Sequence, residues 1–340
     1  MQIGWVLKYV DRTEKIFNSP FLYKRFFTHL VRQQIKRIKK NGPSTVLIEG
    51  TNMCNAKCIT CPHKYMSRSV GIMDMALYKK IVDECKGLGV YSVHPYGFGE
   101  PLLDPFLVER IRYAKSQSIR YVPIFSNFSQ IDEDKISDLI DSGLDEITVG
   151  FEGADKETFE QVRIGINFDD VNSNIVKFLL IRDHLRRKNP LLNLFITRRK
   201  GNEKAVSCVY RRWKNKVNEV FVWPASNWTG ATDEICSSRP RIVFPCFALW
   251  DSVVIRWNGN VVLCSSDYDD FCILGNVRKS SIREIWSSEK LEEIRREHLS
   301  GRGQNVELCR RCRQITFGWP RWFMRAFSQM TGDNLDILKK

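Results

Sequence analysis

Cys54, Cys58 and Cys61 lie within eight consecutive residues, directly after the apolar run TVLIE that begins at Thr45. Thiolates this close together can bind one inorganic cluster from a single loop, and three of them on a four-iron cluster leave one iron open to a further ligand. A structural zinc ion is the alternative, because His63 could complete the four ligands that such an ion requires. The spacing therefore predicts a metal centre in this loop.

A second group of cysteines lies in the last third of the chain, with long segments between its members and a final C-x2-C pair: Cys246, Cys264, Cys309 and Cys312. Four thiolates form a closed ligand set for a second iron-sulfur cluster. A four-cysteine zinc site would have the same spacing. Asn258 and Gly259 predict a hairpin turn that brings two apolar strands together just before Cys264. We expect a second metal centre here.

The remaining cysteines carry weaker signals. Cys85 and Cys208 lie in helix-like segments, where a thiol commonly serves as a small buried apolar side chain. Cys236 and Cys272 belong to neither group and are either buried residues of the same kind or thiols near a substrate. Eleven cysteines without a secretory signal do not indicate a disulfide framework. Metal or redox chemistry accounts better for the two groups.

The elements that must position these residues alternate between apolar runs and helical patterns. Strands are predicted to begin at Thr45, Tyr91, Arg120, Glu146, Leu191 and Asn218. Helices are predicted near 74–86, 104–117, 132–141, 155–163, 169–187 and 202–215. Such repeated strand–helix units indicate a parallel sheet.

Residues at the predicted helix ends support these units. Asp74, Asp104 and Asp132 sit at N-cap positions, where a carboxylate accepts hydrogen bonds from free backbone N–H groups. Gly89 and Gly143 sit where two of the helices must stop.

We predict an α/β fold, namely a partial (β/α)6 TIM-like barrel over residues 45–234. A small α+β domain over 235–315, with short strands and a helix near 280–298, would carry the second cysteine group. Ligands gather at the carboxyl ends of parallel strands. The first cysteine loop leaves the carboxyl end of the first strand, so we expect the active site at that edge.

Composition places the chain among globular proteins. Its 340 residues are 43% apolar and 27% charged, which suits one barrel with an added domain. No apolar run is long enough to span a membrane, and the N-terminus meets charge too early for a signal peptide. We therefore expect a cytoplasmic protein.

The net charge of +14 is concentrated at the two ends of the chain. Residues 1–44 form a predicted basic amphipathic extension, and residues 316–340 form a predicted basic aromatic tail. Such segments either bind an anionic surface such as the inner face of a membrane, or cover part of the barrel with their apolar side. The nearly neutral middle of the chain argues against a nucleic-acid partner.

The first cysteine loop, CNAKCITCP, resembles the signature of the radical S-adenosylmethionine (radical SAM) enzymes. In that family the open iron of a [4Fe-4S] cluster binds the amino and carboxylate groups of S-adenosyl-L-methionine (SAM). The resemblance implies that Cys54, Cys58 and Cys61 hold this cluster. One position departs from the signature, because Thr60 stands where the family commonly has an aromatic residue against the adenine.

Two motifs after later strands extend the resemblance. FGEPLLDP is similar to the family's Gly-Gly-Glu-Pro motif, which receives the methionine amino group. Gly99, Glu100 and Pro101 match this motif, whereas Phe98 replaces its first glycine. The run FSNFSQI is similar to a Ser/Thr-Asn-Gly turn near the ribose, and this similarity implies that two residues of the run contact the cofactor: Ser126 and Asn127.

The stretch after the fourth strand completes the resemblance, which covers about residues 45–225. Glu152 holds a position that is often Asp in the family. Arg163 is implied as a partner of the carboxylate of SAM. In the turn after the third strand, Phe128 stands in the place of the glycine.

The second cysteine group resembles the SPASM and twitch auxiliary domains of the same family. Its order is a single cysteine, Gly-x4-Cys from Gly259 to Cys264, a helix-bearing spacer and C-x2-C. Full SPASM domains have further cysteines and hold two clusters, whereas no cysteine follows Cys312 here. The resemblance therefore implies one auxiliary [4Fe-4S] cluster on Cys246, Cys264, Cys309 and Cys312, and two [4Fe-4S] clusters in all.

The resemblance implies reductive cleavage of SAM to a 5′-deoxyadenosyl radical that abstracts a hydrogen atom from the substrate. An auxiliary cluster can then accept an electron, so we expect dehydrogenation of a secondary alcohol in a sugar-like or aminocyclitol substrate. The alternatives are a C-epimerase, with Cys236 or Cys272 as hydrogen-atom donor, and a peptide- or protein-modifying maturase. The general base stays unassigned, and His94 is one of several residues that could reach the barrel mouth.

The expected partners follow from this chemistry. We expect a small-molecule substrate. An anionic or lipid-linked substrate would suit the basic ends of the chain. The cluster also requires a reductant such as flavodoxin or ferredoxin.

Overall fold

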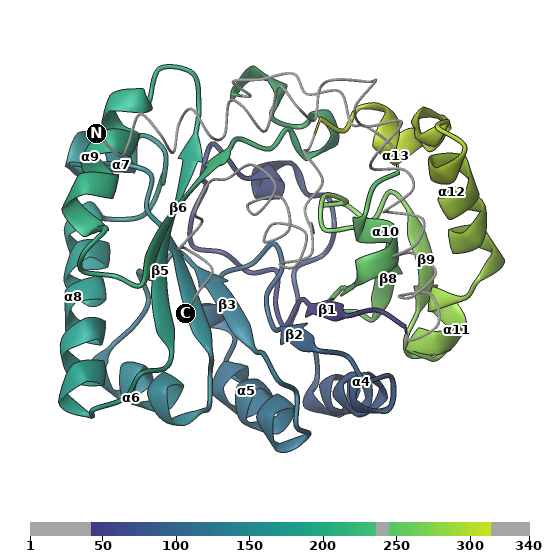
Figure 1. Cartoon of the computed structure of the whole chain (residues 1–340), viewed down its shortest axis with the longest axis horizontal. Helices are drawn as coiled ribbons and strands as arrows, with labels where there is room; N and C mark the ends of the chain where they lie inside the picture. The colour runs from purple at the N-terminus through teal and green to yellow at the C-terminus, as the bar shows by residue number, and fades with distance from the viewer. Residues whose placement is uncertain (1–41, 236–244, 314–340) are drawn as a thin grey trace, which may run out of the picture.

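The computed structural model describes residues 42–235 and 245–313 (Figure 1). The predicted N-terminal extension and C-terminal tail lie outside these residues, apart from residues 42–44, and so does Cys236. No helix among the described residues is both long and apolar enough to cross a membrane.

The six predicted strand–helix units are present. The strands are β1 (Thr45–Ile48), β2 (Ser92–His94), β3 (Pro123–Ser126), β4 (Glu146–Gly150), β5 (Leu191–Arg198) and β6 (Glu219–Pro224). The helices are α4 (Met75–Gly87), α5 (Leu107–Ser116), α6 (Glu133–Asp141), α7 (Lys156–Glu160), α8 (Phe168–His184) and α9 (Glu203–Trp213). Figure 1 shows these helices on the outer side of the strands.

The strands form two hydrogen-bonded sheets. One has the order β3-β4-β5-β6 and is parallel throughout. The other contains β1 and β2, which are also parallel. A parallel bridge between Ser92 and Tyr121 continues the barrel wall from β2 to the segment before β3. The predicted α/β class and partial TIM-like barrel are therefore confirmed, and the described strands do not close into a full barrel.

The C-terminal segment shares a sheet with the barrel. Its strands are β7 (Ser252–Ile255), β8 (Asn260–Val262) and β9 (Ile273–Asn276), and β7 pairs in parallel with β1 over four residues, from Thr45 opposite Ser252 to Ile48 opposite Ile255. The sheet order β2-β1-β7-β8-β9 thus runs from one half of the molecule into the other. The predicted boundary near residue 235 remains a prediction.

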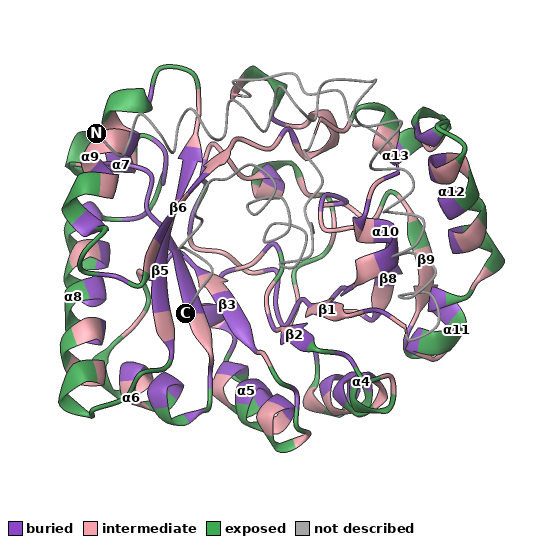
Figure 2. Cartoon of the chain, viewed as in Figure 1, coloured by how far each residue is buried: buried purple, intermediate pink, exposed green. Residues whose placement is uncertain are grey.

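The helices of this C-terminal half are α10 (Ala248–Asp251), α11 (Ile282–Trp286), α12 (Glu289–Leu299) and α13 (Glu307–Arg310). Figure 1 shows α11 and α12 on its outer side. The single helix predicted near 280–298 is divided in two, because Ser288 accepts a hydrogen bond as the N-cap of α12 after α11 has ended. Figure 2 shows buried residues on the strands and on the inner faces of the helices. Apolar side chains fill these layers, including Ile147, Val149 and Leu194.

The helix ends agree with the predictions at all but one position. Asp74 and Asp132 accept N-cap hydrogen bonds, and Gly89 and Gly143 have the positive φ that suits residues just past a helix end. Asp104 is not the N-cap of α5. The N-cap is Phe106, and the carboxylate of Asp104 accepts a hydrogen bond from the N–H of Phe106 over 3.0 Å and binds the buried guanidinium of Arg110 over 2.7 Å.

Candidate active site

The first cysteine loop lies at the carboxyl end of β1, and hydrogen bonds fix its path. The N–H of Cys61 donates to the carbonyl oxygen of Cys58 over 3.2 Å and closes a turn. The N–H groups of Lys57 and Ile59 donate to carbonyl oxygens of the segment after α7, over 2.8 and 3.0 Å. His63, the residue considered as a zinc ligand, places its Nε2 atom 2.8 Å from the carbonyl oxygen of Asn52.

The three thiols of this loop lie close enough to influence one another electrostatically. Burial raises the pKa of Cys54 to about 11 and that of Cys61 to about 12, and the neighbouring cysteines contribute to both shifts. Burial also raises the pKa of Cys58, although Arg163 opposes the shift. A bound metal centre would reverse this preference for the protonated thiols, because the iron ions stabilise thiolates.

The Gly-Glu-Pro motif packs directly on the first cysteine loop. A side chain at Gly99 would lie 2.4 Å from the carbonyl oxygen of Thr51, so only glycine allows this close approach. The backbone N–H of Glu100 donates to the carbonyl oxygen of Met53 over 2.7 Å. Pro101 is buried and begins a short 3-10 turn.

The carboxylate of Glu100 connects this motif to the end of β3. It is 2% exposed and accepts hydrogen bonds from the Ser126 hydroxyl, the Asn127 N–H and the Leu102 N–H, over 2.7, 2.7 and 3.0 Å. Burial raises the pKa of Glu100, and these donors partly oppose that shift.

Asn127 ties the turn after β3 to the cysteine loop. Its side-chain Nδ2–H donates to the Oδ1 atom of Asn55 over 2.8 Å, and Asn55 in turn donates to the hydroxyl of Ser129 over 2.9 Å. Phe128, which replaces the expected glycine, has a φ of 60° and is fully buried against Phe178. The backbone therefore keeps the left-handed conformation that suits glycine, while the side chain contributes to the core.

Arg163 and Glu152 form a buried ion pair beside Cys58. The Nη2 atom of Arg163 lies 2.8 Å from Oε1 of Glu152, and the Nε atom also donates to this carboxylate. The Nη1 atom lies 3.8 Å from the sulfur of Cys58. Burial alone would lower the pKa of Arg163, but Glu152 outweighs this effect and raises it. Arg163 thus places a permanent positive charge against the first thiol group.

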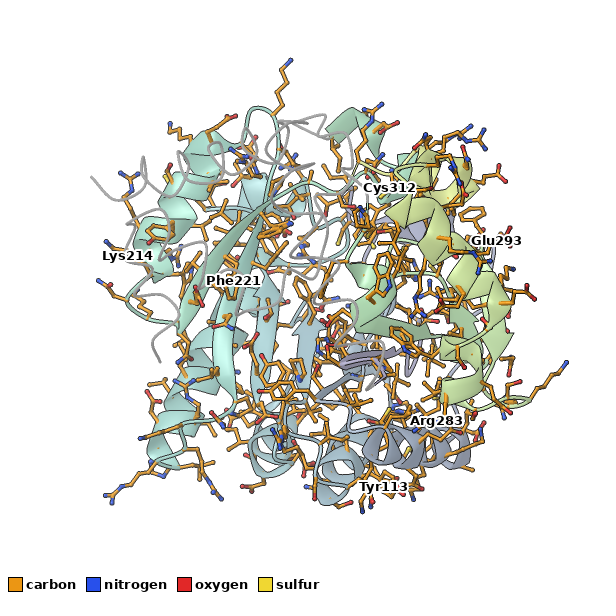
Figure 3. The ribbon with its side chains drawn as sticks, turned by 45° about the vertical axis from the view of Figure 1, so that its right-hand side comes forward. Tyr113, Lys214, Phe221, Arg283, Glu293 and Cys312 are labelled. Carbon is orange, nitrogen blue, oxygen red and sulfur yellow. The ribbon has the colours of Figure 1, made fainter. Side chains whose placement is uncertain are left out.

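The second group of cysteines also comes together. Burial raises the pKa of Cys264 and Cys309, and the shift of Cys309 includes contributions from Cys264, Cys246, Cys312 and Cys272. The N–H of Cys312 donates to the carbonyl oxygen of Cys309 over 3.2 Å. Figure 3 shows Cys312 in the C-terminal half, across the molecule from Phe221 of β6.

Cys272 lies beside the strand end that leads to Cys264, because its carbonyl oxygen accepts a hydrogen bond from the N–H of Leu263 over 3.1 Å. Cys85 is fully buried in α4, as expected for a small apolar residue, and Cys208 lies in α9.

The donor sets fit iron-sulfur clusters. Among the described residues, no three or more His, Cys, Asp or Glu side chains already surround one point at which they could hold a metal ion. A four-iron cluster binds each thiolate at a different iron, so its ligands need not meet at one point. Three buried or half-buried thiols in one loop and four half-buried thiols in the C-terminal half fit the expected open and closed sets.

An aromatic residue that sequence reasoning missed lies next to Thr60. The indole Nε1–H of Trp228 donates to the carbonyl oxygen of Thr60 over 2.8 Å, and its ring packs edge-on against Phe98 at 5.4 Å between centroids. Trp228 therefore lies beside the position where the family has its aromatic residue. The two residues are 168 positions apart, and no spacing rule connects them.

A second missed feature is a buried charge cluster under the same loop. Glu49, directly after β1, is 1% exposed and binds Arg68 over 2.8 Å and Arg256 over 3.4 Å. Burial alone would raise the pKa of Glu49, but the two arginines outweigh it and hold the pKa below its usual value.

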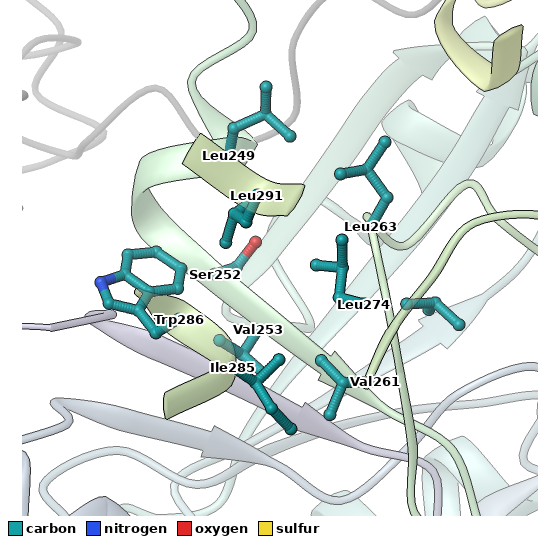
Figure 4. A pocket seen from close by; sticks show the side chains of 10 residues that line it. Leu249, Ser252, Val253, Val261, Leu263, Leu274, Ile285, Trp286 and Leu291 are labelled. Carbon is teal, nitrogen blue, oxygen red and sulfur yellow. The ribbon is translucent and has the colours of Figure 1, made fainter. Parts of the chain in front are cut away.

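Figure 4 shows a pocket in the core of the C-terminal half. Its lining is apolar except for Ser252 and includes Leu249, Leu263 and Trp286. It contains none of the cysteines, so we do not assign it to the active site.

Comparison with known proteins agrees with these two centres. The radical SAM superfamily model matches residues 48–179, and the iron-sulfur cluster-binding SPASM domain model matches residues 246–313. The chain is a radical SAM protein with a C-terminal SPASM domain. A radical SAM domain binds SAM and a [4Fe-4S] cluster, and a SPASM domain binds additional iron-sulfur clusters. The expected cofactors are therefore confirmed.

Individual relatives of this radical SAM protein are distant. The chain is 21% identical to the S-adenosyl-L-methionine-dependent 2-deoxy-scyllo-inosamine dehydrogenase of Niallia circulans, over 80% of this chain and 94% of that protein. It is 22% identical to a tungsten-containing aldehyde ferredoxin oxidoreductase cofactor-modifying protein of Pyrococcus furiosus, over 72% and 80% of the two chains.

Solved structures share the fold. The structure of BtrN in complex with AdoMet and 2-DOIA has a TM-score of 0.57 at 20% identity, and covers 81% of this chain and 94% of BtrN. The structure of Streptococcus suis SuiB bound to the precursor peptide SuiA has a TM-score of 0.64 at 16% identity, and covers 78% of this chain and 70% of SuiB.

Proposed function

We propose that this radical SAM enzyme dehydrogenates a secondary alcohol of a sugar-like or aminocyclitol substrate. When bound, SAM and its cluster supply a 5′-deoxyadenosyl radical, and the auxiliary cluster supplies an electron acceptor. The observation that carries the proposal is the pair of cysteine groups, an open set of three in the barrel and a closed set of four in the SPASM domain. The similarity to a dehydrogenase over 94% of that relative's length supports it.

In this proposal the residues of the first site divide into three roles. Cys54, Cys58 and Cys61 bind the first cluster, and Arg163 beside Cys58 holds the carboxylate of SAM while Glu152 fixes its guanidinium. The loop that contains Gly99, Glu100 and Pro101 receives the amino group, and the turn of Ser126 and Asn127 lies near the ribose. Thr60 lies at the adenine.

The second site has one role in the same proposal. Four cysteines of the SPASM domain bind one auxiliary cluster: Cys246, Cys264, Cys309 and Cys312. Because all four corners are occupied by protein, this centre exchanges electrons and does not bind substrate.

Anaerobic reconstitution tests the proposal. About eight irons per chain are expected for two four-iron clusters, together with formation of 5′-deoxyadenosine when a reductant such as flavodoxin or ferredoxin is present. With candidate cyclitols, the product should lose two hydrogen atoms, as measured by mass spectrometry. A product whose mass equals that of the substrate in H2O, and which gains one deuterium at carbon in D2O, would contradict dehydrogenation and indicate a C-epimerase. Four irons and one zinc per chain would contradict the electron-accepting role.

Candidate peptides belong in the same assay. Modification of a peptide and no turnover of cyclitols would indicate a maturase. The position of Cys272 among the SPASM cysteines gives no support to its role as a hydrogen-atom donor in an epimerase.

The cellular setting is part of the proposal. We propose a cytoplasmic enzyme whose basic ends contact an anionic membrane or an anionic, lipid-linked substrate. Flotation with anionic and neutral vesicles tests this contact, and equal failure to bind both kinds of vesicle would contradict it.

A further inference from the structure

Two adjacent residues after β6 hydrogen-bond to both cysteine turns. The indole Nε1–H of Trp228 donates to the carbonyl oxygen of Thr60 over 2.8 Å. The side-chain Nδ2–H of Asn227 donates to the carbonyl oxygen of Arg311, also over 2.8 Å. Each accepting residue directly precedes the last cysteine of a C-x2-C turn, Cys61 in one case and Cys312 in the other.

The two turns have the same backbone hydrogen bond. In each, the N–H of the last cysteine donates to the carbonyl oxygen of the first cysteine over 3.2 Å. The carbonyl group of the third residue in each turn accepts from the 227–228 pair. One dipeptide therefore holds equivalent positions of two turns that belong to different centres. Figure 1 shows the chain after β6 crossing from the barrel toward α13, at the end of which the second turn lies.

Asn227 is held firmly in this position. It is fully buried, and its Oδ1 atom accepts a hydrogen bond from the N–H of Arg313 over 2.9 Å. Its Nδ2 atom also donates to the carboxylate of Asp233 over 3.0 Å. An asparagine amide has two donor hydrogens and one acceptor oxygen, and all three are engaged here.

Trp228 keeps its place at a cost in backbone energy. Its φ is 43°, and that of the following Thr229 is 58°. Left-handed conformations are unfavourable for residues other than glycine. They persist where surrounding contacts enforce them, and such positions cluster at functional sites. The contacts with Thr60 and Phe98 provide this enforcement.

We propose that Asn227 and Trp228 are positioning residues that couple the two cluster loops. They fix the Cys58–Cys61 turn relative to the Cys309–Cys312 turn, so a change at one turn is transmitted to the other. Hydrogen bonding and solvent exposure around thiolate ligands set the reduction potential of an iron-sulfur cluster. The two centres of this chain therefore have coupled potentials. The inference goes beyond the proposed reaction, because it holds for any substrate.

Two conservative variants test the coupling in the anaerobically reconstituted, full-length protein. Trp228→Phe removes the indole N–H and keeps an aromatic ring against Phe98. Asn227→Asp keeps the Oδ1 acceptor for Arg313. It replaces the Nδ2 group, which donates to Arg311 and to Asp233, with an oxygen. Redox titrations followed by electron paramagnetic resonance measure the potential of each cluster separately.

Each variant should shift the potentials of both clusters. We expect each of the lost hydrogen bonds to stabilise one oxidation state of the nearer cluster more than the other, by up to about fivefold in the reduction equilibrium. At 59 mV per tenfold for one electron, the potential of the nearer cluster should shift by up to about 40 mV. The potential of the more distant cluster should shift by a smaller amount, which should still exceed the shift measured in the control variant. The double variant should deviate from the sum of the two single variants.

Trp286→Phe is the matched control. Trp286 is buried in α11 of the SPASM domain, and its Nε1 atom has no hydrogen-bond partner among the described residues. Trp228→Phe alone decides the outcome if Asn227→Asp loses iron. A shift confined to the nearer cluster, with additive effects in the double variant, would overturn the proposal.

Discussion

The guanidinium of Arg163 occupies the space that a side chain at residue 150 would need. A Cβ atom added to Gly150 would lie 1.5 Å from the Nη2 atom of Arg163. Gly150→Ala should therefore displace Arg163 from Glu152 and from Cys58. Misplacement of a positioning group by about 1 Å can cost about 100-fold in rate. We expect a loss of this size in 5′-deoxyadenosine formation, measured by chromatography of single-turnover reactions, with unchanged circular dichroism.

Gly87→Ala is the control for that variant. Gly87 ends α4, and an added Cβ would meet no atom within 4 Å. Its activity should equal that of the parent, and its stability should rise by about 0.5–1 kcal/mol. Full activity of Gly150→Ala would contradict the role assigned to Arg163.

Glu100 offers a second test at the residue scale. Its carboxylate accepts three hydrogen bonds, and two of the donors are backbone N–H groups. Glu100→Gln would turn an amide N–H2 group toward at least one of these donors, at a cost of about 1–3 kcal/mol for each buried group left without a partner. We expect a loss of stability in this range in urea denaturation, together with weaker SAM binding in equilibrium dialysis.

Glu157→Gln serves as the comparison for Glu100. Glu157 is exposed on α7 and accepts a 3.4 Å hydrogen bond from Gln161. The free energy of unfolding should change by less than about 0.5 kcal/mol there. Equal effects of the two substitutions would show that the buried carboxylate has no special role.

The role of a single residue could be predicted where the residues that act together are close in the sequence. A metal centre was predicted from Cys54, Cys58 and Cys61, because their sulfur atoms lie in one short loop. Trp228 was not predictable, because its contact with Thr60 joins residues 168 positions apart. Phe128 shows how a motif can depart from its family in sequence and keep its backbone, since its φ of 60° is the conformation expected for glycine.

At the scale of elements, local signals predicted most of the helices and strands. Asp74 and Asp132 cap their helices as expected, because an N-cap needs only the next three residues. Asp104 has the same sequence signal but pairs with the buried Arg110, a contact that only the packed structure provides. The pairing of β7 with β1 was also missed, since strand partners distant in sequence leave no local pattern.

One side chain of the SPASM domain holds the backbone of the loop after the third cysteine. The carboxylate of Asp269 accepts hydrogen bonds from the N–H and hydroxyl of Ser67 over 2.7 and 2.8 Å, and from the N–H of Arg68 over 3.1 Å. Asp269→Ala removes all three. Because each hydrogen bond to a charged group is worth about 1.5–3 kcal/mol, the loop should open more often.

Hydrogen–deuterium exchange measures this opening. The amides of Ser67 and Arg68 should exchange at least about tenfold faster in Asp269→Ala, whereas β4 and β5 should keep their protection. Asp138→Ala is a suitable control, because Asp138 forms an exposed ion pair with Arg112 on the barrel surface. Unchanged exchange at residues 67 and 68 would show that other contacts hold the loop.

At the scale of the whole molecule, the barrel and the SPASM domain share one sheet, so we expect them to unfold as one unit. The sheet β2-β1-β7-β8-β9 crosses between them without interruption. Glu49 follows β1, Arg256 follows β7, and Arg68 belongs to the loop after the third cysteine, so one buried charge cluster joins three segments. This shared sheet could not be predicted from the sequence. The strand–helix repeat of the barrel ends before the SPASM segment begins, so the two parts look like separate domains.

Glu49→Gln tests this unity. Removing the carboxylate leaves Asp270 as the remaining opposing charge for both Arg68 and Arg256, at 3.7 and 3.1 Å. Loss of one partner from a buried ion pair costs up to about 3–5 kcal/mol. Because the charge cluster joins both halves, Trp fluorescence and circular dichroism should report one unfolding transition, which moves as a whole to a lower denaturant concentration.

Glu109→Gln is the control. It removes an exposed partner of Lys79 and should change the free energy of unfolding by less than about 1 kcal/mol. Two separate transitions, with only one of them shifted in Glu49→Gln, would mean that the halves fold independently. The coupling of the two cluster loops would then depend on Asn227 and Trp228 without support from a common core.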